Sequence, residues 1–149
     1  MNIAARLAPL ALLLGACAGS GHQLVPMPVT QASVLGDRCR VYVTRQDTLP
    51  GSIRNVRVFD GEDEIGIIAE GEFLCWDRRP QQGVGRVVFE GLGPKLSAVE
   101  NVFDLPREGG TTSYYSIKIV QSGHKPVVEL LPVAEGKTLI EKRSPASVH

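Results

Sequence analysis

The chain has 149 residues, with 16 basic and 16 acidic side chains and a formal net charge of zero. Hydrophobic residues make up 43% of the sequence, as in ordinary globular proteins. This length fits a single domain that folds without a metal, and the balanced charge, with no basic block, argues against nucleic acid as a partner.

The first 16 residues have the layout of a bacterial secretory signal. A single positive charge, Arg6, precedes a short apolar run over residues 7–14, and small residues follow it. The run has about half the length that a bilayer core requires, so a transmembrane anchor is disfavoured.

The end of this signal, Leu14-Gly15-Ala16-Cys17, resembles the lipobox of bacterial lipoproteins, in which a peptidase cuts before a cysteine that carries a diacylglycerol. We therefore expect residues 1–16 to be removed as a lipoprotein signal peptide and Cys17 to be lipidated. The alternative is an ordinary signal whose cysteine is incidental. The resemblance also implies the outer membrane, facing the periplasm, because residue 18 is Ala and not the aspartate that retains such proteins in the inner membrane.

Residues 17–36 contain glycines and prolines without helical or strand periodicity, which predicts a lipidated, flexible tether. Fully extended, this tether would span about 60 Å. Within it, residues 24–29 combine apolar side chains with two prolines, a composition that also suits a sheet edge.

The remaining cysteines, Cys39 and Cys75, form an even pair once Cys17 carries the lipid. In the oxidising periplasm such a pair predicts a disulfide, worth about 3 to 4 kcal/mol in the chain-entropy model. The alternative is two separate buried thiols, since the sequence does not place the two Cα atoms within bridging distance.

From residue 37 the sequence predicts short strands at near-regular spacing. Cys39, Val41 and Val43 alternate with side chains of the opposite face, and the Asp60-Gly61 turn predicts a hairpin over residues 56–68. Further strands are expected over residues 73–76, 86–89, 97–105, 111–120 and 127–131, and one or two helical turns over residues 134–142.

These elements predict an all-β fold, an antiparallel β-sandwich of about seven or eight short strands with a short C-terminal helix. The sandwich domain is expected to span residues 37–143, followed by a disordered tail over residues 144–149. The strand over residues 73–76 is apolar on both faces, so we expect it to be covered on both.

No compact catalytic or metal motif stands in the sequence. The acidic cluster at residues 60–64 lacks the spacing of a calcium loop and reads as a hairpin tip. A zinc site from Cys39, Cys75 and His124 would require the fold to gather them, and His124 has no nucleophile motif beside it. We therefore expect no metal, no cofactor and no enzymatic activity.

The segment Trp76-Asp77-Arg78-Arg79-Pro80 is the candidate partner surface, because Trp76, Arg78 and Arg79 are residue types that dominate binding hot spots. The alternative, which we favour from the pattern, is a tryptophan packed between layers with both arginines solvated beyond the strand end.

Residues 40–45, 56–66 and 71–76 together resemble a family of small bacterial lipoproteins with an uncharacterised domain. The resemblance covers about residues 38–142 and departs from the family pattern in the loop over residues 80–83. It implies a transthyretin-like or carboxypeptidase-regulatory-like β-sandwich on a lipid anchor, with no known catalytic residue.

The sequence thus predicts a lipid-anchored, non-catalytic envelope lipoprotein that binds an envelope protein or a cell-wall component. Two alternatives remain open. One is a scaffold lipoprotein of a secretion or envelope-spanning assembly, and the other is a periplasmic hydrolase or an inhibitor of one.

Overall fold

The computed structural model of the protein describes residues 23–24, 33–46, 55–89, 99–119 and 126–146. The predicted signal peptide, Cys17 and all three histidines lie outside these residues. Within them are ten strands and one helix: β1 (Gln23–Leu24), β2 (Cys39–Arg45), β3 (Val56–Asp60), β4 (Asp63–Ile68), β5 (Glu72–Arg78), β6 (Val84–Phe89), β7 (Val99–Asp104), β8 (Thr112–Ile119), β9 (Pro126–Leu131), α1 (Val133–Ile140) and β10 (Ser144–Pro145).

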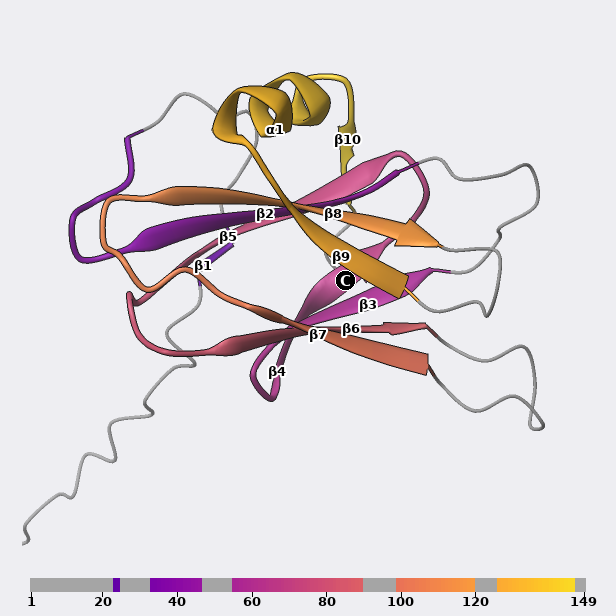
Figure 1. Cartoon of the computed structure of the whole chain (residues 1–149), viewed down its shortest axis with the longest axis horizontal. Coiled ribbons are helices and arrows are strands. Elements are labelled where there is room, and N and C mark those ends of the chain that lie inside the picture. Colours follow the sequence, from indigo (N-terminus) through magenta and orange to yellow (C-terminus); the bar gives the residue numbers. More distant parts are fainter. Residues whose placement is uncertain (1–22, 25–32, 47–54, 90–98, 120–125, 147–149) are drawn as a thin grey trace, which may run out of the picture.

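The strands form two sheets that pack face to face (Figure 1). Sheet A has the order β1-β5-β2-β8-β9, with β10 also paired to β5, and sheet B has the order β4-β3-β6-β7. Eight of the described strands have five or more residues, so the predicted all-β sandwich is confirmed. The β2–β8 and β10–β5 pairs are parallel, whereas the remaining pairs of the described strands are antiparallel.

The main hydrophobic core lies between the two sheets. Side chains at alternate positions meet there, because each strand turns every second residue to the same face. From sheet A these are Val41, Val43, Leu74 and Trp76, and sheet B contributes Val56, Val58, Val87 and Phe89, among others. The hairpin predicted around Asp60-Gly61 is present as β3 and β4, with Gly61 at a φ of 62° that suits glycine.

A second, smaller core lies on the outer face of sheet A, under α1 (Figure 1). It consists of Tyr42, Phe73, Cys75, Tyr114, Leu131 and Ile140. The rings of Tyr42 and Tyr114 stack at 5.0 Å between centroids. Because α1 covers this face, β2 is buried along its whole length and β5 along most of it, which confirms the expectation for residues 73–76.

Gly136 allows α1 to approach this face closely. A Cβ at this position would lie 2.3 Å from Cγ of Tyr114, a distance that no side chain tolerates. Gly136 lowers the helix propensity of this segment, but it is also the residue that lets α1 pack closely on the sheet. None of the described helices is long and apolar enough to cross a bilayer.

The outer edge of β5 is closed by segments from both ends of the chain. β1 pairs antiparallel with it at Asp77 and Trp76, and β10 pairs parallel with it at Glu72 and Phe73. The predicted tether is therefore wrong at residues 23–24, which belong to the sheet. The predicted disordered tail is wrong at residues 144–146, because Ser144 and Pro145 pair with β5 and Ala146 is buried.

Replacing Gly136 with alanine should lower the free energy of unfolding by about 1 to 3 kcal/mol, because overpacking against Tyr114 costs that much. Helix propensity alone predicts the opposite sign, a gain of about 1 kcal/mol. Urea denaturation followed by the fluorescence of Trp76, the single tryptophan, measures the change. Gly36→Ala is the matched control, since its Cβ would meet nothing within 4 Å. A Gly136→Ala protein as stable as the parent would contradict the prediction.

Candidate functional site

The most concentrated group of polar side chains lies between the sheets at one end of the sandwich, around Asp60. Asp60 belongs to β3, and its Oδ2 atom accepts hydrogen bonds from Trp76 Nε1 at 3.0 Å and from Arg78 Nε at 2.8 Å. Both donors belong to β5, so one carboxylate oxygen joins sheet B to sheet A. The side chains of Arg78 and Asp60 are 3% and 5% exposed, which makes this a buried ion pair.

Arg78 extends the same network to two loops. Its second nitrogen, Nη1, donates to the carbonyl oxygens of Gln81 at 3.0 Å and Pro106 at 2.8 Å. The Cys39 thiol lies beside it and donates to the carbonyls of Pro106 and Arg78. Each polar group of this network therefore has an internal partner, as buried polar groups require.

This geometry corrects the candidate partner surface. Trp76 is fully buried between the sheets, as the favoured alternative states, but Arg78 is also buried and not solvated beyond the strand end. Of the three residues predicted for this surface, only Arg79 is exposed. Sequence reasoning missed Asp60 as their partner, because the Asp-Gly pair explained that residue as a turn former.

The outer face of sheet A carries a second charged pair. Arg40 of β2 donates from Nε to Asp77 Oδ1 at 2.7 Å and from Nη2 to Oδ2 at 3.0 Å. The two residues are direct cross-strand partners in the register of β2 and β5. This bidentate pair is mostly covered, with side chains 7% and 18% exposed, and it fixes the pairing of the two central strands.

The predicted disulfide is wrong, because Cys39 and Cys75 are both free, buried thiols. In the β2–β5 register, Cys39 faces Arg78 and Cys75 faces Tyr42, three positions farther along. Adjacent positions of a strand point to opposite faces, so Cys39 belongs to the inner face of sheet A and Cys75 to the outer face under α1. The sheet itself separates the two sulfurs.

Burial also makes both thiols poor nucleophiles. It raises the pKa of Cys75 from its ordinary value of 9.0 to about 12, and it raises the pKa of Cys39 in the same direction despite the nearby Arg78 guanidinium. The reactive species of a cysteine is the thiolate, so neither residue has the environment of a catalytic cysteine.

The acidic cluster at residues 60–64 does not act as one unit. Asp60 points into the core, whereas Glu62 and Asp63 are exposed at the hairpin tip. Glu64 forms a bidentate pair with Arg57 on the outer face of sheet B. The described residues contain no group of three or more His, Cys, Asp or Glu side chains that would hold a metal.

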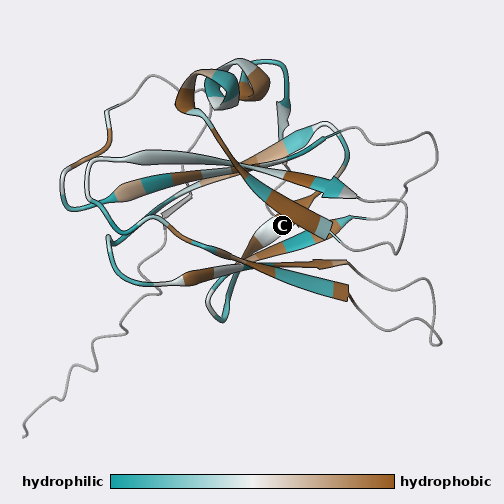
Figure 2. Cartoon of the chain, viewed as in Figure 1, coloured by the Kyte–Doolittle hydropathy of each residue, from teal (hydrophilic) through white to brown (hydrophobic). Residues whose placement is uncertain are grey.

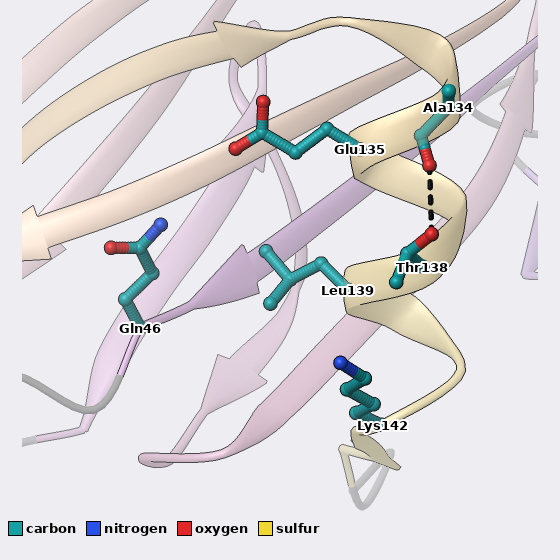
Figure 3. A pocket seen from close by; sticks show the side chains of 6 residues that line it. All are labelled: Gln46, Ala134, Glu135, Thr138, Leu139 and Lys142. Carbon is teal, nitrogen blue, oxygen red and sulfur yellow. Dashed lines mark hydrogen bonds between the residues drawn. The ribbon is translucent and has the colours of Figure 1, made fainter.

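A cavity of about 420 Å³ lies between α1 and the end of β2 (Figure 3). Its lining residues are Gln46, Ala134, Glu135, Thr138, Leu139 and Lys142. Figure 3 shows Glu135 and Leu139 projecting from α1 on the side of Gln46, and the Thr138 hydroxyl donating to the Ala134 carbonyl at 3.0 Å. The lining thus offers the carboxylate of Glu135, the amine of Lys142 and the amide of Gln46 around a leucine. The hydroxyl of Thr138 is already engaged in its bond to the Ala134 carbonyl.

The outer face of sheet B has a different cover. Phe59 points outward there, and the guanidinium groups of Arg86 and Arg57 lie over its ring, at 4.5 and 5.5 Å from the centroid. Each arginine also pairs with a carboxylate, Glu100 and Glu64 respectively. Cation–π contacts therefore shield this aromatic ring without a further layer of structure.

The two outer edges of sheet A differ in the described residues. β1 and β10 close the edge at β5, whereas none of the described strands pairs with the outer edge of β9. β9 carries two exposed large hydrophobic side chains, Val127 at 41% and Leu130 at 62%. The sequence predicts a strand over residues 127–131 but not its place at an edge, because that place depends on the strand order.

Comparison with protein-family models, with curated proteins and with solved structures found no match for this chain.

Asp60→Asn should lower the free energy of unfolding by about 3 to 5 kcal/mol, because it leaves the Arg78 charge buried without its counter-charge. Glu64→Gln is the matched control: it breaks an ion pair whose side chains are 40% and 34% exposed and should cost less than about 1 kcal/mol. Urea denaturation of both variants measures the difference. Equal losses for the two variants would refute the structural role of the buried pair.

The protein without its predicted lipid cysteine, as the Cys17→Ala variant, should contain two free thiols. A thiol reagent added at pH 8 to the native protein should react slowly, because burial shields both sulfurs and holds the pKa of Cys75 near 12. After denaturation without a reductant, both thiols should react at once. Finding no thiol in the denatured, unreduced protein would restore the disulfide.

Proposed function

We propose that this chain is a lipid-anchored, non-catalytic interaction module that faces the periplasm from the outer membrane and binds an extended segment of an envelope protein along β9. The observation that carries this proposal is the contrast between the two edges of sheet A. One edge is closed by β1 and β10, whereas none of the described strands pairs with the other, which contacts β7 of sheet B at its start.

An open sheet edge presents unpaired backbone N–H and C=O groups, which can accept another strand. Proteins usually protect such edges with charges, and the two edges of sheet B follow that rule. β4 carries Asp63 and Glu64 at its exposed positions, and β7 carries Glu100 and Asp104. Of its six residues, β9 has a single charged one, Glu129.

The side chains of β9 suit an apolar partner strand. Figure 2 shows this strand coloured mostly as hydrophobic although it lies at an edge, and its exposed residues Val127 and Leu130 are apolar. At the start of β9, the Pro126 carbonyl already accepts a hydrogen bond from Asn101 Nδ2 of β7 at 2.7 Å. A partner strand would therefore pair with the part of β9 that follows Pro126.

The polar groups favour binding over catalysis. Asp60, Arg78 and Cys39 are bonded to one another and to backbone carbonyls inside the sandwich, and Arg40 is bonded to Asp77. They hold strands and loops in place and leave no free acid, base or nucleophile among themselves.

The anchor defines where the partner is found. Leu14-Gly15-Ala16-Cys17 supports a lipid on Cys17, and Ala18 supports the outer membrane. A module held there by a lipid meets envelope proteins at a high local concentration, which favours a modest interface such as one added strand.

A photoreactive phenylalanine analogue in place of Leu130 should form a discrete crosslinked product with a protein in intact bacterial cells. Val127→Lys in the same protein should reduce that product several-fold, because a lysine on an open edge opposes strand addition. Cys17→Ala should abolish palmitate labelling, move the protein to the soluble fraction and reduce the product. Gel mobility after irradiation and cell fractionation measure these effects.

The matched control places the same analogue at Val102, an exposed valine on the outer face of sheet B that is 57% exposed. It should give little product. Equal crosslinking from both positions would contradict the β9 site, and a crosslinked product made of glycan would assign the site to a cell-wall component instead. Palmitate labelling that survives Cys17→Ala would contradict the anchor.

A further inference from the structure

We propose that the sandwich is oriented with one particular end toward the membrane, and that this end contacts phospholipid headgroups. The loop end, as we call it, consists of residues 33–38, 79–83 and 105–111. It lies where β5 ends and where β2 and β8 begin, at the left of Figure 1. This inference rests on the proposed lipid on Cys17 and concerns how the anchored domain is oriented.

The first step is the length of chain between the lipid and the sheet. β1 begins at Gln23, so only residues 18–22 separate it from Cys17. Six residue steps of extended chain reach about 20 Å at most. The pairing of β1 with β5 therefore shortens the linker between Cys17 and the sheet from the expected length of about 60 Å to about 20 Å.

The second step is the direction of β1, which indicates the side of the domain on which this short linker begins. β1 runs antiparallel to β5, with Gln23 opposite Asp77 and Leu24 opposite Trp76. Followed from Leu24 back to Gln23, β1 therefore points toward Arg78, where β5 ends. We accordingly place the lipid on the side of the loop end, and the opposite end, where β10 meets Glu72, away from the membrane.

The third step is that the loop end is firmly built. The Arg78 guanidinium holds the carbonyls of Gln81 and Pro106, from two of its three loops. The third loop is joined by a hydrogen bond of 2.7 Å from the Gly110 N–H to the Arg38 carbonyl. Because these loops are joined to one another and to the sheet, a short linker attached beside this end orients the whole domain.

The surface chemistry of the loop end suits a headgroup layer. Leu35 is 71% exposed, and Arg79 is also exposed. The Arg107 side chain, which pairs with Asp104 at 4.0 Å, is 56% exposed. Arginine binds phosphate through a planar fork of donors, and an exposed leucine gains from entering the interface. Acidic neighbours, among them Asp37 and Glu108, balance these charges. The contact of the loop end with headgroups is therefore weak by itself, and it forms only when the lipid on Cys17 holds the domain at the membrane.

The test uses the full-length lipidated protein in liposomes of phosphatidylethanolamine and phosphatidylglycerol that carry a nitroxide-labelled lipid. A fluorophore is attached at Arg79→Cys in the loop end or at Lys142→Cys, which lies two residues before β10 at the opposite end. The buried thiols Cys39 and Cys75 should react only slowly under native conditions, so brief labelling selects the introduced cysteine. Nitroxide quenching should be several-fold stronger at position 79 than at position 142.

Leu24→Pro tests the role of β1, because proline removes a backbone donor from the strand. It should reduce quenching at position 79 to the level at position 142 while palmitate labelling persists. The Cys17→Ala protein should not bind these liposomes. Equal quenching at both positions in the parent, or unchanged quenching in Leu24→Pro, would overturn the orientation and leave the proposed function intact. Loss of palmitate labelling from the parent would overturn both.

Discussion

The Asp60 carboxylate is the contact on which the arrangement of this sandwich depends. Through one oxygen it binds the tryptophan and the arginine of β5, and it thereby locks β3 of one sheet to β5 of the other. A buried ion pair adds little net stability by itself, because desolvation costs offset the attraction, but it is intolerant of losing one partner. Such a pair selects one packing of the sheets over others that would bury the same apolar area.

Arg78 passes this constraint on to the surface. The same guanidinium that binds Asp60 holds the carbonyls of Gln81 and Pro106, so the loop end is fixed by the interior. Arg40 and Asp77 act in parallel on the other face of sheet A, next to the pairing site of β1. Two buried or mostly covered ion pairs thus lie at the part of β5 that pairs with β1.

Much of the fold was predictable from local signals, because alternation and turn chemistry act over a few residues. Asp60-Gly61 predicted the β3–β4 hairpin, and the alternation from Cys39 predicted β2. Properties that depend on pairing were not predictable. The disulfide failed because Cys39 and Cys75 differ by an odd number of positions in the β2–β5 register, which places them on opposite faces. Strands of two residues, such as β1 and β10, carry no period at all.

The candidate sites divide along the same line. Trp76 and Arg78 have the composition of a hot spot, yet a β-strand in the middle of a sandwich turns such residues inward, and a single sequence does not reveal strand order. The open edge of β9 could not be predicted from the sequence for the same reason. Its exposed side chains, Val127 and Leu130, look like ordinary core positions until the sheet is seen to end there.

The short strand β1 has two roles at the β5 edge of sheet A. This short strand both covers part of the β5 edge and sets the length of chain between the sheet and Cys17. Release of β1 would free β5 at Asp77 and Trp76, while β10 would still cover Glu72 and Phe73. On the lipid anchor that we propose, the same release would also lengthen the chain between the domain and the membrane, so one short strand would affect both the reach of the domain and the cover of its β5 edge.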